Sequence, residues 1–414
     1  MTISRVVYVV ESPLSARDHD RFGISVLAEA GFDVEVWEVQ ALFLPRAQEP
    51  AAVHFADCRV RSFTSLEVLV ASSRALREDV LVILVCAVYL GELPRHLPLI
   101  RALMQGRSHL AAVAAGQRPP VPPQPMAAGG SVARVRRLRG RLSNGDVSIR
   151  SAASIMKSRL KARFFRSLAR RHIGGFRELA WIWAGTDIDS VDPLFVGPHT
   201  RIRFIHTFDF DRILRAQTAP KDLRASIVYL DALGPLHPDF KALDISVEIS
   251  SHVWFGFVNR ALDEFAAASG LEVIIAAHPR AQPGSLDTVY SGKRVVHGQT
   301  ESLIHSAKCV VISDPTTSIG MAAWHGRPIT VVKCGRLFDT HQLELEQYAD
   351  LLALEVLEPG RIPVDWSPPA VKASAYERFL RAYVKRPGTP TSTFWEVVVT
   401  DILSWSKSEL DVFE

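Results

Sequence analysis

Short apolar runs alternate with amphipathic segments along much of the sequence. In the first third, strands are predicted at RVVYVVES and FDVEVWEV, on either side of the helix-like segment HDRFGISVLAEAG. The pattern continues with VLVILVCAV and HLAAVAAG. Uninterrupted runs of Val, Ile and Leu are typical of parallel strands that are covered on both faces. The first third therefore predicts a Rossmann-like α/β domain.

A second series of strands and helices begins near Ser226. Five strands are predicted at ASIVYLDAL, LEVIIAAHPR, KRVVHG, AKCVVISD and PITVVK, separated by helices such as HVWFGFVNRALDEFAAASG and TESLIHSA. A chain of 414 residues is about two to three times the common domain size. The sequence thus predicts an α/β fold with two Rossmann-like domains and a cleft between them. We expect the domains over residues 1–220 and 221–390, and a final helix, 391–414, that packs the domains together.

The two series are separated by a change in composition. Residues 116–130 are rich in proline, which predicts a loop of the first domain. Residues 131–171 then hold thirteen Arg or Lys against a single acid, a local charge of +12, whereas the whole chain carries +4. We expect residues 131–172 to be largely helical. Cations mixed with apolar residues over 151–172 favour peripheral contact with an anionic membrane, or else a solvated face packed on its own domain.

Composition excludes several classes of protein. With 48% hydrophobic and 22% charged residues, the chain is globular rather than disordered. Its four cysteines are scattered and indicate reduced core residues, and no spacing is typical of a metal site. The first residues lack the pattern of a signal peptide, and no apolar run approaches about 20 residues. We therefore expect a cytoplasmic protein that binds no nucleic acid, since no nucleic-acid-binding module accompanies the basic segment.

Polar residues follow three predicted strands of the second half. One strand ends in His278, Pro279 and Arg280, another leads to Thr300 and Glu301, and a third leads to residues 316–318. The last segment contributes Thr316, Thr317 and Ser318 immediately before a helix rich in small residues. Hydroxyls and unpaired N–H groups at a helix start attract anions, and His278 and Arg280 would reach a phosphate from a neighbouring strand end. Each segment also has a plainer interpretation, because Ser and Thr commonly cap helices.

The order of these two motifs resembles a known enzyme family. A His-Pro motif at a strand end, followed some forty residues later by a Ser/Thr motif entering a helix, resembles bacterial GT-B glycosyltransferases that use CMP-activated sugars, such as sialyltransferases and Kdo transferases. The resemblance implies that His278 and residues 316–318 bind the CMP phosphate of a nucleotide-sugar substrate, with no cofactor and no metal. VVESPLSARDHDRFGISVLAEAGFDVEVWEV and YLDALGPLHPDF are similar to segments of surface-polysaccharide proteins.

Glycosyl transfer requires a carboxylate as base or nucleophile. Asp231 is the first candidate because it ends an apolar strand before a Gly-Pro turn, although a turn-capping role fits the same position. Glu11, at the end of the first strand, is the second. Asp209 and Asp211 are a third possibility, whereas Asp18 and Asp20 are predicted to cap the helix that follows them.

The sequence therefore predicts a glycosyltransferase that moves a sugar from a nucleotide donor to a saccharide or lipid-linked glycan acceptor. Capsule, lipopolysaccharide or another surface glycan would be the product. Two alternatives stay open at this point. One is a sugar-nucleotide epimerase of the same fold, and the other is a non-catalytic transferase-like scaffold in a polysaccharide assembly complex.

Overall fold

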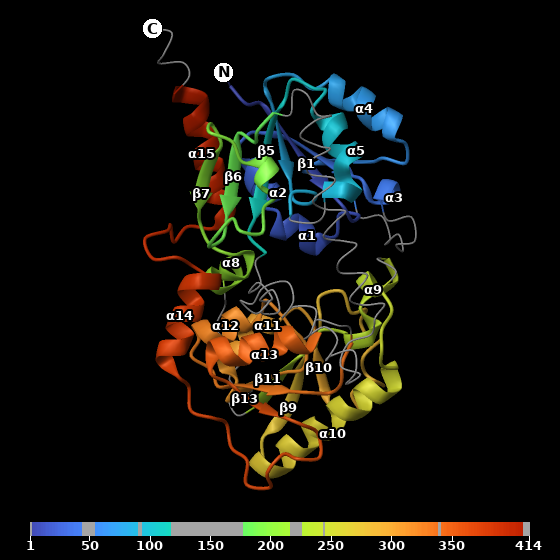
Figure 1. Cartoon of the computed structure of the whole chain (residues 1–414), viewed down its shortest axis with the longest axis vertical. Coiled ribbons are helices and arrows are strands. Elements are labelled where there is room, and N and C mark those ends of the chain that lie inside the picture. The colour runs from blue at the N-terminus through green and yellow to red at the C-terminus, as the bar shows by residue number, and fades with distance from the viewer. Residues whose placement is uncertain are drawn as a thin grey trace, which may run out of the picture.

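A computed structural model describes residues 2–43, 54–89, 93–116, 177–215, 226–242, 245–337 and 341–408. Over these ranges the chain forms two α/β domains, stacked one above the other in Figure 1, and each is built on its own parallel sheet. The predicted two-domain α/β architecture is therefore confirmed. The proline-rich segment from residue 117 on, the basic segment 131–172 and the boundary predicted at residues 220 and 221 lie outside the described residues.

The sheet of the first domain has seven strands in the order β3-β2-β1-β4-β5-β6-β7, and its strand pairs are parallel. Its strands are β1 (Arg5–Val10), β2 (Asp33–Glu38), β3 (Arg59–Ser62), β4 (Val80–Leu84), β5 (His109–Ala114), β6 (Trp181–Ala184) and β7 (Arg201–Phe204). Successive residues of β1 enter opposite cores, with Val7 and Val9 on one face and Val6 and Tyr8 on the other. This alternation explains the continuous apolar run, because both faces of the sheet are covered.

The sheet of the second domain has six parallel strands in the order β10-β9-β8-β11-β12-β13. Its strands are β8 (Ser226–Leu230), β9 (Glu272–Ala276), β10 (Arg294–Val296), β11 (Cys309–Ile312), β12 (Ile329–Val332) and β13 (Glu355–Leu357). The five strands predicted from the second half of the sequence are confirmed. Two hydrophobic cores again lie on opposite faces of the sheet.

Helices cover both sheets. In the first part of the chain they are α1 (Ala16–Arg21), α2 (Ile24–Glu29), α3 (Gln40–Phe43), α4 (Leu66–Arg74), α5 (Leu93–Leu103), η1 (Pro193–Phe195) and α8 (Phe208–Leu214). In the second part they are η3 (Gly234–Leu236), α9 (Pro238–Ala242), α10 (Ser251–Ser269), α11 (Thr300–Ser306), α12 (Ile319–Trp324), α13 (His341–Leu352), α14 (Ala373–Tyr383) and α15 (Phe394–Ser408). None of the described helices combines the length and the apolar composition needed to cross a bilayer.

The chain crosses back from the second domain to the first after α14. Figure 1 shows α15 beside β6 and β7 of the first sheet, far from the other helices of its colour. Phe394, Trp395 and Val398 enter the core of the first domain. Gly23, which separates α1 from α2 with φ +56°, lets Trp395 approach, because a Cβ at this position would lie 2.2 Å from Cγ of Trp395. The final helix thus packs on the first domain, and the segment before it joins the two domains.

The four cysteines are free thiols, as predicted. Cys86, Cys309 and Cys334 are buried, whereas Cys58 is half-buried.

Candidate functional site

The carboxyl ends of strands from both domains meet at one pocket. Ala115 and Gly116, which follow β5, line it from the first domain, and Thr317, which lies between β11 and α12, lines it from the second. The other lining residues belong to α8, α12, α13 and α14 or lie beside them: Thr207, Asp209, Ile213, Ile319, Gly320, Met321, Tyr348, Phe379, Tyr383 and Val384. Open α/β sheets bind ligands beyond the carboxyl ends of their strands, so this pocket is a candidate binding site.

His278 follows β9 and is held as a neutral donor. Its Nδ1 accepts a hydrogen bond from the backbone N–H of Arg280 at 3.1 Å, which leaves the ring proton on Nε2. Burial, together with the charges of His237, Arg17 and Arg280, lowers the pKa of His278 to about 3. The ring therefore offers an N–H group, without a positive charge, at neutral pH. That group is suited to a phosphate or hydroxyl oxygen.

A second His-Pro motif, absent from the predicted site, lies beside the first. The rings of His237 and His278 stack edge to face with their centroids 5.1 Å apart. Asp239, two residues after His237, pairs with Nη1 of Arg280 at 2.5 Å. The loop before α9 and the end of β9 thus form one polar surface. The two His-Pro dipeptides are 41 residues apart in the sequence, and the fold brings them together.

Arginines of the first domain face this surface from across the cleft. Burial and the charges of Arg21, Arg280 and Arg212 hold the pKa of Arg17 below its ordinary value, although Asp18 acts in the opposite sense. Neither Arg21 nor Arg212 forms an ion pair with another described residue. We call Arg17, Arg21, Arg212 and Arg280 the cationic cluster, and the neutral ring of His278 borders it. Such a concentration of positive charge between two domains attracts an anion.

Arg21 links the cationic cluster to the pocket. Its guanidinium lies over the ring of Phe208, 5.0 Å from the centroid. A Cβ placed on Gly116 would lie 3.3 Å from Nη2 of Arg21, and Gly116 lines the pocket opposite Thr317. Arg21 of the first domain therefore lies next to the pocket, which Thr317 of the second domain lines.

The predicted hydroxyl segment is half-buried and reaches this pocket. Oγ1 of Thr316 accepts from the backbone N–H of Ser318 at 3.3 Å, so one hydroxyl of the segment acts as a local turn former. Thr317 lines the pocket directly. β9 and β11 flank β8, so His278 and Thr316 lie at strand ends about 10 Å apart rather than at neighbouring ones. No hydrogen bond joins residues 316–318 to His278 or Arg280 among the described residues.

Asp231 is buried and its oxygens are used inside the second domain. Oδ1 accepts from the Tyr290 hydroxyl at 2.6 Å and from the backbone N–H of Leu233 at 2.9 Å, and Oδ2 accepts from the backbone N–H of His278 at 3.1 Å. Burial raises the pKa of Asp231, and these hydrogen bonds oppose the shift. The carboxylate therefore positions the backbone of His278.

Glu11, the second carboxylate candidate, is more accessible than Asp231. It follows β1, and its side chain is 21% exposed. Oε1 pairs with Nε2 of the fully buried His96 at 2.7 Å and also with Arg95. A buried histidine thus orients a partly exposed carboxylate at the carboxyl end of a central strand. This arrangement suits a base that must meet a ligand.

Among the remaining candidates Asp209 lines the pocket, whereas Glu301, Asp211 and Asp20 have internal partners. Thr300 and Glu301 are buried at the start of α11, and Oε1 of Glu301 pairs with Nε2 of His325 at 2.6 Å. Asp211 accepts from the backbone N–H of Phe394 at 2.8 Å, and burial raises its pKa. Asp20 pairs with Arg215. Ser15 is the N-cap of α1, and Asp18 lies in its first turn.

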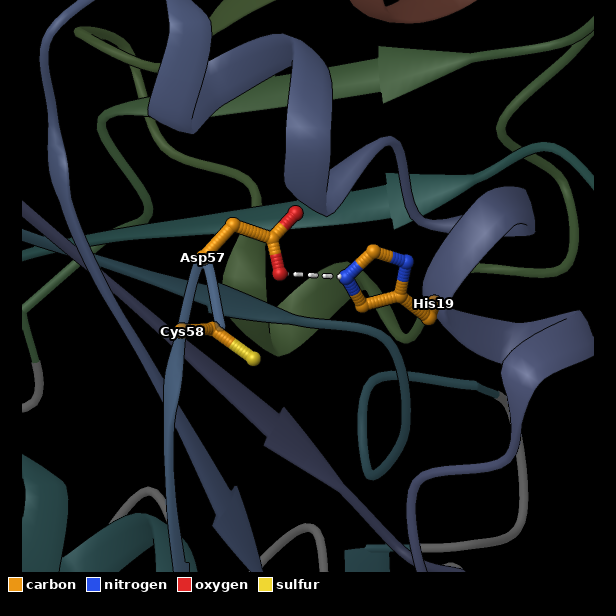
Figure 2. A group of neighbouring side chains, drawn as sticks. All are labelled: His19, Asp57 and Cys58. Carbon is orange, nitrogen blue, oxygen red and sulfur yellow. Dashed lines mark hydrogen bonds and ion pairs between the residues drawn. The ribbon is translucent and has the colours of Figure 1, made fainter. Parts of the chain in front are cut away.

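A His–Asp pair that the sequence did not reveal joins His19 of α1 to Asp57, which precedes β3. Figure 2 shows His19 facing Asp57, with Nε2 and Oδ1 2.8 Å apart and Cys58 beside them. Burial would raise the pKa of Asp57, but hydrogen bonds from His19 and Ser25 outweigh it and hold the pKa below its ordinary value. Burial and the charge of Asp57 raise the pKa of Cys58 to about 11, so its thiol is protonated at neutral pH.

The position of His19 on its helix separates this pair from the cationic cluster. Arg17 and Arg21 are four residues apart and share one face of α1. His19 is two residues from each of them and lies on the opposite face, where it stacks on Phe55. The pair therefore secures α1 to its own domain.

Comparison with known proteins gave structural matches only. No protein-family model and no curated protein matches the sequence. Similar solved structures include CalG4, the calicheamicin glycosyltransferase, at 12% identity and TM-score 0.43, over 98% of this chain and 93% of that one. UGT89C1 of Arabidopsis thaliana in complex with UDP-L-rhamnose is similar at 14% identity and TM-score 0.46, over 97% of this chain and 100% of that one. The forosaminyltransferase SpnP is similar at 13% identity and TM-score 0.39, over 98% of this chain and 95% of that one.

Proposed function

We propose that the chain is a GT-B glycosyltransferase that holds the phosphate of a nucleotide sugar between its two domains. The observation that carries this proposal is the cationic cluster. The charge of Arg280 in the second domain lowers the pKa of Arg17 in the first domain. The charge of Arg17 in turn lowers the pKa of His278 in the second domain. Like charges brought together from two domains repel each other, so an anion between them stabilises the closed arrangement.

The chemistry of glycosyl transfer fits this distribution of charge. As the bond between the sugar and the nucleotide breaks, negative charge grows on the departing phosphate, and fixed donors that point at it lower the barrier. Arg17, Arg21 and Arg280 supply positive charge, and Nε2 of His278 supplies a neutral donor. Thr317 contributes a hydroxyl at the adjoining pocket.

Glu11 is the better of the two carboxylates for the acceptor. A base must reach the hydroxyl proton that it removes, directly or through one water. Glu11 is partly exposed and oriented by His96, whereas Asp231 is enclosed by three hydrogen-bond donors. We therefore assign deprotonation of the acceptor hydroxyl to Glu11 and positioning of the His278 backbone to Asp231.

The donor nucleotide is proposed as CMP, and the product as a surface glycan. The resemblance of the His-Pro and Ser/Thr motifs supports CMP, and a sugar with its own carboxylate would place a second negative charge near the four arginines. Contact of the basic segment 151–172 with an anionic membrane would bring the enzyme to a lipid-linked acceptor.

The test is a binding panel followed by product analysis. CMP, UDP, GDP and dTDP are titrated into the full chain by calorimetry, alongside the matched nucleosides. We expect a nucleotide to bind far more tightly than its nucleoside, and the difference to shrink in Arg17→Ala and His278→Ala. CMP-sugars and UDP-sugars are then incubated with glycan acceptors. A new glycan supports transfer, an epimerised donor indicates an epimerase, and nucleotide binding without any turnover indicates a scaffold. Absence of binding by every nucleotide would overturn the proposal.

A further inference from the structure

Two histidines at the ends of neighbouring helices present ring nitrogens to each other. His305 lies in the last turn of α11, and His325 follows α12 directly. Their Nδ1 atoms are 3.2 Å apart, and the ring planes are 81° apart. The side chains thus converge on one point from two helices.

Glu301 fixes the tautomer of one of these rings. Oε1 of Glu301 lies 2.6 Å from Nε2 of His325, and the carboxylate side chain is 8% exposed. The ring proton of His325 therefore lies on Nε2, and Nδ1 keeps its lone pair. A carboxylate that holds one nitrogen of a histidine while the other faces a shared point is the arrangement seen around metal-bound histidines.

One oxygen of the buried Glu301 carboxylate also lacks a hydrogen-bond partner among the described residues. Oε2 of Glu301 is buried and makes no hydrogen bond to a described residue. A buried negative charge is costly unless positive charge or further donors lie nearby. A cation on the far nitrogen of His325 would supply that charge through the ring.

The spacing of the two nitrogens matches a tetrahedral ion. Zinc binds histidine nitrogens at about 2.0–2.1 Å, and two ligands at a tetrahedral angle are then about 3.3 Å apart. The separation here, 3.2 Å, is that of a hydrogen bond between the two nitrogens, and it also agrees with the spacing of two zinc ligands.

We propose that His305 and His325 bind a zinc ion through their Nδ1 atoms, with Glu301 orienting His325. His305 is exposed, so water can complete the coordination. Imidazole ligands also suit copper and nickel, which places the ion among the divalent transition metals. This site stands apart from the proposed transfer reaction. It would join the carboxyl ends of α11 and α12, the helices that begin near Thr300 and Ser318.

The second group of possible ligands, His19, Asp57 and Cys58, is less suited to an ion. Nε2 of His19 and Oδ1 of Asp57 are 2.8 Å apart, as in a hydrogen-bonded pair, and Oδ2 is held by Ser25.

Equilibrium dialysis of the untagged full chain against zinc ions tests the proposal. We expect His305→Ala and His325→Ala each to lose one equivalent of bound zinc. Glu301→Gln should keep the site and weaken it about 10- to 100-fold. His252→Ala removes an exposed histidine on α10, and His19→Ala removes the second group, so both should bind zinc like the wild type.

Cobalt gives an independent readout that does not depend on counting ions. Bound to the wild type, Co²⁺ should show visible absorption bands of low-symmetry coordination that disappear in His305→Ala. Thermal unfolding confirms that each variant is folded, and zinc should raise the Tm of the wild type but not that of His305→Ala. Equal zinc affinity and stoichiometry in the wild type and both histidine variants would show that the rings form only a hydrogen bond. Absence of zinc binding by the wild type would also overturn the proposal.

Discussion

The two edges of the cleft use their charged residues in opposite ways. In the second domain Asp231 and Glu301 are buried and bonded to groups of their own domain. In the first domain Glu11 pairs with His96 and Arg95 but stays partly exposed, and the charge of Arg280 from the other domain contributes to the lowered pKa of Arg17. We therefore propose that a carboxylate at a strand end builds the loop where it is enclosed, as Asp231 is, and meets a ligand where it is exposed, as Glu11 is. Exposure and the number of internal donors distinguish the two roles.

Exchanging the two carboxylates for amides tests this comparison most severely. Glu11→Gln should lower turnover by about a hundredfold or more, because a base acts in the transition state, and it should leave donor affinity nearly unchanged. The measurement is steady-state kinetics with a donor and acceptor established by product analysis, together with calorimetry of donor binding.

Asp231→Asn is the comparison variant in that experiment. Its main effect should be on folding stability rather than on turnover of the folded fraction. Full activity in Glu11→Gln with a hundredfold loss in folded Asp231→Asn would reverse the assignment of roles.

The arginines of the first domain provide the next largest effect. Arg17→Ala should weaken nucleotide binding about 10- to 100-fold, because a charge-assisted contact contributes about 1.5–3 kcal/mol. Arg361→Ala is the matched control, since Arg361 is 78% exposed and belongs to the second domain. Calorimetry should also show that the loss is smaller at high salt, where the field of the cluster is screened. If Arg17→Ala and Arg361→Ala bind equally well, the phosphate does not lie between the domains.

Whether a strand could be predicted from the sequence depends on how many of its residues are buried. Central strands such as β1 and β8 were predictable because both of their faces are buried. No strand was predicted at β3, β7 or β13, whose residues are mostly exposed and therefore form no apolar run. The buried strand β6 was not predicted either, because it spans only four residues.

Among the candidate site residues, His278 could be proposed from the sequence because it follows an apolar strand. Arg17 was not, because a charged residue in a short amphipathic helix resembles a solvated one until the opposite domain is in place. The structural role of Asp231 could not be predicted from the sequence either. Its donor Tyr290 lies 59 residues away, so only the tertiary fold shows that the carboxylate is enclosed.

The third prediction concerns the contribution of Asp231 to folding stability. Asp231→Asn should lower the free energy of unfolding by about 1–3 kcal/mol, because the amide turns a donor toward groups that need an acceptor. Chemical denaturation monitored by fluorescence gives the value. Asp365→Asn changes an exposed acid of the same domain and should stay within about 0.5 kcal/mol of the wild type. Equal stability of the two variants would mean that Asp231 is free for another role.

The smallest effect concerns the neutral ring of His278. Its pKa is about 3 in the folded protein, whereas a histidine in an unfolded chain titrates near 6.5. Between these values the unfolded state binds a proton that the native state does not. The contribution of this group to stability is therefore present above about pH 6.5 and is lost as the pH falls toward 3. The slope from one proton is at most about 1.4 kcal/mol per pH unit.

His278→Gln isolates that contribution, because glutamine does not titrate. Denaturation of the nucleotide-free protein at pH 7.5, 6.0 and 5.0 should show the wild type losing stability relative to the variant as the pH falls. The variant controls for every other group that titrates in this range, since only residue 278 differs. Parallel stability curves would show that His278 titrates normally in the folded state. In that case the ring would be a cation at mildly acidic pH, and the second edge of the cleft would attract phosphate by charge, as we propose for the first edge.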